Sequence, residues 1–179
     1  MELMSSPPKL TTFSYAILVL VGEGGAGPHD LVRMMRDGRV YWAAPESQYY
    51  AEPKRLAQAG YLTATKQPGR THARTHYTLT DQGRQALKRW LATPTRFPRI
   101  QNEPVVRLLG SEYADRGELL ASLKALRNEL DELDAALKAA ALREQGLPHR
   151  ATVLRLNRRL AQRLLDAHRQ WLDEVEAEL

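Results

Sequence analysis

Apolar positions follow helical spacing along most of the chain, interrupted by short stretches rich in β-branched and aromatic residues. In the first ninety residues, apolar side chains recur every three or four positions between breaks that contain Gly or Pro. This spacing places them on one face of a helix. It predicts four helices, over residues 11–23, 28–37, 45–59 and 81–91.

A β-hairpin is predicted between the third and fourth helices. Residues 61–65 and 75–79 are rich in Thr, Tyr and Leu, a composition typical of strands. Pro68 and Gly69 supply a turn signal between them. We also expect residues 39–42 to be extended.

Pro53 lies inside the predicted third helix. A proline there removes one backbone hydrogen bond and pushes against the preceding turn. We therefore expect this helix to be kinked, or to begin about one turn later than its pattern indicates.

The rest of the chain has a helical pattern throughout. It predicts helices over residues 103–109, 115–144 and 150–179, the last two joined by a turn at Gly146–Pro148. Leucines in the first long helix alternate at spacings of four and three, the a/d pattern of a packed helix seam. Each long helix would measure about 45 Å, too long to bury its apolar face against a domain of some ninety residues. We therefore expect an arm that pairs with another chain.

The order of three helices, strand, wing, strand and helix is that of a winged helix-turn-helix domain. The predicted fold is mainly α with a small β-hairpin wing. A winged helix-turn-helix domain spans residues 1–96, and a coiled-coil-like helical dimerisation domain spans residues 97–179. The residues expected to form the dimer are Leu119, Leu123, Leu126, Leu130, Leu133, Leu137, Leu160, Leu164 and Trp171.

The positive charge of the chain is concentrated in its first half. Residues 1–98 carry 13 Lys and Arg against 7 Asp and Glu, whereas residues 99–179 carry 13 against 14. A basic excess confined to the winged-helix half indicates a polyanionic partner for that half, most simply double-stranded DNA.

The third helix and the wing contain the residue types that DNA recognition uses. In a winged helix the third helix enters the major groove and the hairpin reaches phosphates or a flanking minor groove. The candidate DNA-binding residues carry hydroxyl, amide or basic groups: Ser47, Gln48, Tyr49, Lys54, Arg55, Lys66, Arg70, His72 and Arg74. Of the adjacent Tyr49 and Tyr50, one is expected to face outward and one inward, and Tyr49 is assigned outward. We expect Lys54 and Arg55 to contact phosphates rather than bases.

Several classes of function lack support in the sequence. The chain has no Cys, and His72 and His76 have no acidic neighbour, so we expect neither a metal nor a cofactor. We find no Gly-x-Ser-x-Gly motif, no phosphate-binding Gly loop and no paired carboxylates, and therefore expect no enzymatic activity. No apolar run approaches the roughly 20 residues that span a bilayer, and the first residues do not have the pattern of a signal peptide. We expect a cytoplasmic protein without membrane contact.

The third helix also resembles a known family. The run from Ser47 to Leu56, followed by Gly60-Tyr61-Leu62, is similar to the recognition helix of the PadR family of transcriptional regulators. Three further stretches resemble the family's opening helix, the start of its second helix and its exit from the wing: residues 11–18, 27–31 and 77–83. The helical remainder resembles the longer C-terminal arm of the family's virulence-activator-like branch.

Two residues depart from the family's pattern. His29 stands where an aromatic residue such as Tyr is expected, and Pro53 where an apolar helix former is common. Pro53 leaves the fold intact but bears on how the recognition helix lies in the groove.

The resemblance implies a homodimer that represses transcription from a palindromic operator and is released by a small hydrophobic or phenolic ligand. Trp42 and Trp171 are candidates to line the effector pocket, with core or interface packing as the alternative. A second interpretation is a protein-interaction adaptor whose winged helix has lost DNA binding. An adaptor would have an apolar or acidic third helix, whereas the residues here are polar and basic.

Overall fold

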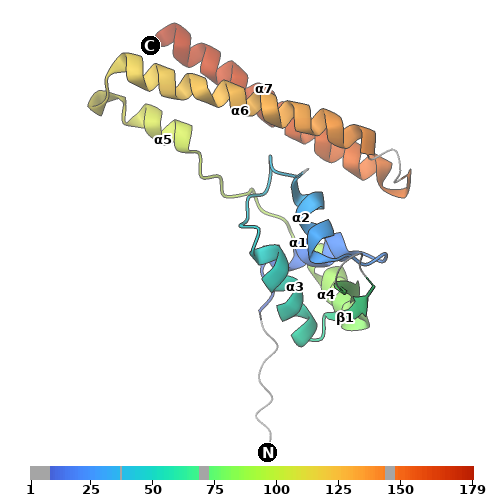
Figure 1. Cartoon of the computed structure of the whole chain (residues 1–179). Helices are drawn as coiled ribbons and strands as arrows, with labels where there is room; N and C mark the ends of the chain where they lie inside the picture. Colours follow the sequence, from blue (N-terminus) through green and yellow to red (C-terminus); the bar gives the residue numbers. More distant parts are fainter. Residues whose placement is uncertain (1–8, 37, 69–72, 144–147) are drawn as a thin grey trace, which may run out of the picture. The chain divides into compact units, whose positions relative to one another are not determined.

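The computed structural model describes residues 9–36, 38–68, 73–143 and 148–179. The chain divides into two compact units, one ending at Arg96 and one beginning at Phe97, with Arg39–Tyr41 grouped with the second (Figure 1).

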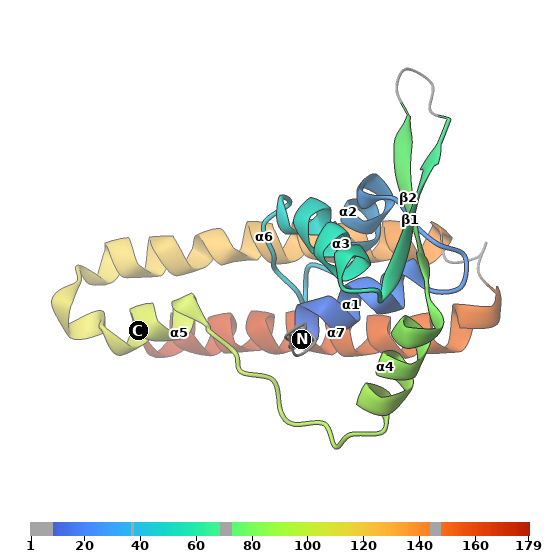
Figure 2. The ribbon, with the colours of Figure 1, turned by 90° about the horizontal axis from the view of Figure 1, so that it is seen from below.

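The first unit is a winged helix, as the sequence predicts. Its elements are α1 (Thr12–Val21), α2 (Pro28–Arg36), α3 (Gln48–Gln58), β1 (Leu62–Gln67), β2 (Arg74–Leu79) and α4 (Asp81–Leu91). The two strands pair antiparallel, from Leu62 opposite Leu79 to Gln67 opposite Arg74. The hairpin projects from the helices of this unit (Figure 2).

The core of the first unit lies where its three N-terminal helices meet the hairpin. Ile17 and Leu18 of α1, Leu31 of α2 and Leu56 of α3 are fully buried there. Each buried aliphatic side chain of this size stabilises the fold by about 1.5–3 kcal/mol. This core fixes which face of α3 remains exposed.

The junction between α3, β1 and α4 holds the hairpin in place. Gly60 ends α3 with a positive φ of 81°, a conformation that favours glycine. The hydroxyl of Thr80 donates to the carbonyl of Gly60 (2.7 Å) and accepts from the amide of Gly83 (3.0 Å), so one side chain caps α4 and ties it to the end of α3.

Helix α3 begins at Gln48, three residues after the predicted start at Pro45. Glu46 and Ser47 form a turn in front of it. Pro53 lies within the helix with its ring buried in the core. Of the two outcomes expected for Pro53, the structure shows the later start. The prediction of an extended segment at residues 39–42 is wrong, because residues 38–41 form a turn in which the amide of Trp42 donates to the carbonyl of Gly38.

The second unit is a helical arm. It contains α5 (Glu103–Leu109), the short helix η1 (Ser111–Tyr113), α6 (Arg116–Arg143), the short helix η3 (Pro148–Arg150) and α7 (Ala151–Glu178). Helices α6 and α7 run antiparallel, side by side along their lengths (Figures 1 and 2). Among the described residues, no helix combines the length and apolarity needed to cross a membrane.

The leucine seam of α6 packs against α7 of the same chain. Four of the predicted leucines are buried and two are half-buried in one cluster with Ala161, Leu165, Leu172 and Val175: Leu119, Leu123, Leu130 and Leu137, then Leu126 and Leu133. These leucines therefore use much of their apolar area against α7 of the same chain, and a role for them in contact with a second chain stays a prediction. Of the other predicted dimer residues, Leu160 is exposed, and Leu164 and Trp171 are half-buried.

Candidate nucleic-acid interface

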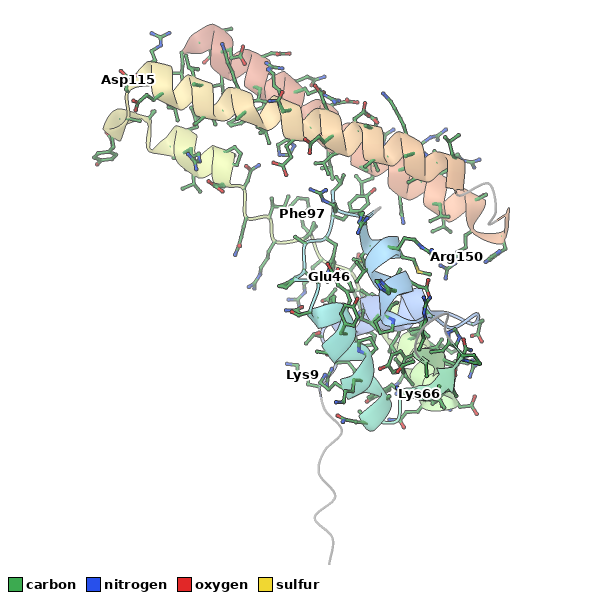
Figure 3. All side chains as sticks on the ribbon, in the orientation of Figure 1. Lys9, Glu46, Lys66, Phe97, Asp115 and Arg150 are labelled. Carbon is green, nitrogen blue, oxygen red and sulfur yellow. The ribbon has the colours of Figure 1, made fainter. Side chains whose placement is uncertain are left out.

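One face of α3 is exposed and polar. The exposed side chains of the helix belong to Gln48, Tyr50, Ala51, Lys54 and Gln58, and that of Ser47 is exposed in the turn just before it. Glu46, labelled in Figure 3, stands just before the helix. Amide, phenol and ammonium groups on this face can donate or accept hydrogen bonds, while the methyl of Ala51 leaves room for close approach.

Tyr49 lies on the opposite face and anchors α3. Its side chain is only 5% exposed, and its ring meets that of Phe13 edge-on with centroids 5.2 Å apart. Burial raises the pKa of the Tyr49 phenol. The assignment of Tyr49 as the outward tyrosine is wrong. Tyr50 is the outward one, with 43% of its side chain exposed.

Arg55 is engaged by its own helix and by α1 rather than extended into solvent. Its guanidinium donates to the carboxylate of Glu52 at 2.6 and 2.8 Å and to the hydroxyl of the buried Ser14 at 3.1 Å. Burial raises the pKa of the Glu52 carboxyl, but hydrogen bonds to Arg55 and Ser14 and the charge of Arg55 outweigh it, so the net pKa is lowered. This network fixes α3 on α1 and leaves Lys54 as the exposed cation of the helix.

His29 stands beside the exposed face, and its place there was missed in the sequence. Its ring lies edge-on to that of Tyr50, with centroids 6.4 Å apart, and the side chain is exposed at the start of α2. In the sequence, the only sign of a special role for His29 is its departure from the family pattern. Its position beside Tyr50 depends on the packing of α2 against α3.

The wing adds basic groups on the hairpin (Figure 3). Lys66 of β1 is exposed, and its ammonium donates to the hydroxyl of Thr75 on β2 at 3.0 Å. Arg74 is exposed at the start of β2. Two further candidates, Arg70 and His72, lie outside the described residues.

Comparison with known proteins decides the family. The model of the transcriptional regulator PadR-like family matches residues 17–89. The probable transcriptional regulator Rv1176c of Mycobacterium tuberculosis is 30% identical, and the alignment covers 90% of this chain and 94% of that protein. The chain belongs to the PadR-like family of transcriptional regulators.

Other PadR-like proteins match over different lengths. The negative transcriptional regulator PadR of Bacillus subtilis is 29% identical over 69% of this chain, and the match spans 64% of that relative's length. The solved virulence activator AphA of Vibrio cholerae is 25% identical, with a TM-score of 0.70 over 93% of this chain and 97% of AphA. Bacillus subtilis PadR in complex with operator DNA has a TM-score of 0.72 at 21% identity, covering 94% of this chain and 99% of that one. These similarities place both the winged helix and the long arm within the PadR-like fold.

The two tryptophans considered for an effector pocket belong to different units of this PadR-like chain. Trp42 stacks on Phe13 with ring centroids 6.0 Å apart, and among the described residues its buried indole nitrogen has no hydrogen-bond partner. Trp171 packs half-buried against the apolar core of the arm. An open pocket of about 290 Å³ between α6 and α7 is lined by neither tryptophan. In the described part of the chain, no group of His, Asp and Glu side chains could hold a metal ion.

Proposed function

We propose that this chain is a sequence-specific DNA-binding repressor that acts as a homodimer on a palindromic operator. The observation that carries the proposal is the exposed face of α3 in a PadR-like winged helix. This face presents Gln48, Tyr50 and Lys54. The only carboxylate within α3 belongs to Glu52, and it is paired with the guanidinium of Arg55.

The exposed groups on α3 suit contacts with the bases or the phosphates of DNA. The amide of Gln48 can pair with adenine through two hydrogen bonds, and the methyl of Ala51 can contact that of thymine. Lys54 suits a phosphate. The hydroxyl groups of Ser47 and Tyr50 can donate hydrogen bonds to bases or to phosphates. Tyr49 and Arg55 support the helix instead, the first through its ring and the second through Glu52 and Ser14.

The wing contributes contacts that do not depend on sequence. Lys66 and Arg74 are exposed on the two strands, and Arg70 and His72 belong to the same basic segment of the sequence. Cations of this kind neutralise phosphates and release counterions, so they strengthen binding to any duplex.

Two parts of the proposal, repression of transcription and control by a small ligand, are based on relatives. The Bacillus subtilis relative is named a negative transcriptional regulator, and its structure has been solved with p-coumaric acid. We infer a small hydrophobic or phenolic effector that relieves repression here too. Trp42 is our candidate contact because its indole N–H lacks an acceptor among the described residues.

An adaptor without DNA binding is the second candidate function. It would need a third helix with an apolar or acidic exposed surface. The exposed residues of α3 favour DNA instead, because they include Lys54 and two glutamines and no free carboxylate of the helix.

A footprint on the DNA upstream of the protein's own gene tests the proposal. A homodimer should protect two related half-sites about one helical turn apart. One isolated half-site would contradict the dimer, and no protected stretch would contradict specific binding. Adding a phenolic acid should remove the protection if the effector proposal holds.

A matched pair of variants separates recognition of the DNA sequence from binding that is independent of sequence. Gln48→Ala should narrow the difference in affinity between the operator and a scrambled duplex by roughly tenfold, since one bidentate contact contributes about 1–3 kcal/mol. Arg74→Ala should weaken binding to both duplexes by a similar factor. If Gln48→Ala weakens binding to both duplexes equally, Gln48 does not contribute to sequence recognition.

A further inference from the structure

His29 is an exposed histidine at the second position of α2. Its ring lies edge-on to that of the exposed Tyr50, with centroids 6.4 Å apart and planes at 68°, an arrangement that aromatic pairs favour. Among the described residues, no hydrogen bond or ion pair involves this imidazole. Both ring nitrogens therefore remain available to a group outside the chain.

The carboxylate next to His29 in sequence is engaged elsewhere. One oxygen of Asp30 accepts from the amide of Gly27 at 3.2 Å, and the other accepts from the guanidinium of Arg33 at 2.9 Å. Asp30 thus holds the start of α2, and its charge is balanced by Arg33. His76 of β2, a strand that pairs with the segment just before α2, is half-buried.

The helices packed on α2 leave a net positive charge beside His29. Helix α1 contains no charged residue. On α3, Glu52 and Arg55 pair with each other, and Lys54 is exposed one turn beyond Tyr50. Glu46 is exposed in the turn that precedes the helix. A protonated imidazole on α2 would add to the positive charge that Lys54 gives this side of the winged helix.

The size of the major groove indicates what His29 would meet on DNA. The groove is about 12 Å wide, and a helix with its side chains is about 10–12 Å across. Helix α3 therefore fills the groove when it enters. A side chain of α2 that lies beside Tyr50 then reaches the edge of the groove, where phosphates rather than base edges are exposed.

We propose that His29 contacts a phosphate of the operator in its protonated form and thereby makes operator binding depend on pH. This rests on the proposed DNA binding and adds a form of regulation to it. Histidine ordinarily changes charge between pH 5 and 8, and only the imidazolium has a positive charge and a donor on both nitrogens. Because the phosphate favours the protonated ring, affinity rises as the pH falls.

Fluorescence anisotropy at pH 6 and pH 8 tests this, with the full chain and the duplex upstream of its own gene. Between pH 8 and pH 6, wild type should gain roughly fivefold more affinity than His29→Tyr. That substitution keeps an aromatic ring beside Tyr50 but does not titrate in this range. The wing histidines, His72 and His76, are present in both chains, so their contributions cancel in the comparison.

Two further variants and the dependence on salt distinguish a charge effect from a structural one. His29→Lys is charged at both pH values, so it should bind more tightly than His29→Tyr at both and show the same small pH dependence. His149→Gln, at an exposed position of the arm, is the matched control and should keep the pH dependence of wild type. The plot of log affinity against log salt should be steeper by about one at pH 6 than at pH 8 in wild type but not in His29→Tyr.

The outcomes separate this inference from the proposed function. Equal pH dependence in wild type and His29→Tyr would overturn the role of His29, as would weaker binding of wild type at pH 6 than at pH 8. If wild type in either case still prefers the upstream duplex to a scrambled one, the proposed DNA recognition stands. Equal binding of wild type to both duplexes at each pH would overturn the proposed function itself.

Discussion

Tyr49 and Tyr50 are adjacent in sequence, but their side chains lie in different environments. Consecutive positions on a helix point about 100° apart, so one ring packs on Phe13 while the other stays at the surface beside His29. The first tyrosine holds α3 in place, and the second belongs to the surface that we propose reads DNA.

Alanine substitution should separate these two roles. Tyr49→Ala removes a buried ring and should lower the free energy of unfolding by about 3–5 kcal/mol. Tyr50→Ala should change it by less than about 0.5 kcal/mol, yet weaken operator binding by roughly tenfold. Urea unfolding and fluorescence anisotropy measure the two quantities. A large loss of stability in Tyr50→Ala would contradict the placement of these rings.

The Glu52 carboxylate should make stability depend on pH at the acid end. Its pKa in the folded chain is lowered, by the hydrogen bonds and charge of Arg55 acting against burial. The stabilisation is therefore complete above the unfolded-state pKa and is lost as pH falls through the folded value. Glu52→Gln should cost about 1 kcal/mol at neutral pH, a figure discounted because Arg55 is partly exposed.

Urea titrations from pH 7 down to pH 3 check this dependence. The difference in stability between wild type and Glu52→Gln should shrink as the pH falls. A difference that stays constant over the whole range would show that the carboxylate charge contributes nothing. Glu112→Gln, at an exposed site in the arm, serves as the control and should leave the pH dependence unchanged.

At the scale of elements, sequence periodicity located the helices well. Helix α5 has the predicted bounds, and α6 and α7 lie within one residue of theirs at each end. The a/d spacing of the α6 leucines correctly predicted a packed seam. It could not identify the partner, because a heptad pattern is the same whether the facing helix belongs to the same chain or to another.

The α3 region shows a second limit of periodicity. The pattern required one tyrosine inside and one outside, but which one depends on where α1 contacts the helix. Helix α3 begins at Gln48 and accommodates Pro53 in its interior, with the proline ring buried in the core. Likewise, the engagement of Arg55 by Ser14 joins residues 41 positions apart, which no local pattern indicates.

Two leucines of α6 provide a test of the seam. Leu123 is buried against α7, and Leu123→Ala should lower the stability of the arm by about 2–5 kcal/mol. Leu142, on the same helix, is exposed, so Leu142→Ala should change stability by less than about 0.5 kcal/mol. Unfolding followed by circular dichroism distinguishes them, and equal effects would contradict the seam within the chain.

At the scale of the whole molecule, the distribution of charge follows the division into two units. The basic excess lies in residues 1–98, and the arm is nearly neutral overall but basic at one end and acidic at the other. Charge counts along the sequence predicted the polyanionic partner proposed for the first half. They did not reveal the two ends of the arm, because residues 97–134 and 166–179 come together only when α6 and α7 fold back on each other.

The central claim is that this PadR-like chain recognises a DNA sequence, and a competition titration tests it most directly. The affinity for the duplex upstream of its own gene is compared with that for a scrambled duplex of equal length and composition, at 0.15 M salt and at higher concentrations. We predict roughly 10³-fold tighter binding to the upstream duplex and a steep loss of both affinities as salt rises. Equal affinities for the two duplexes at every salt concentration would contradict the claim.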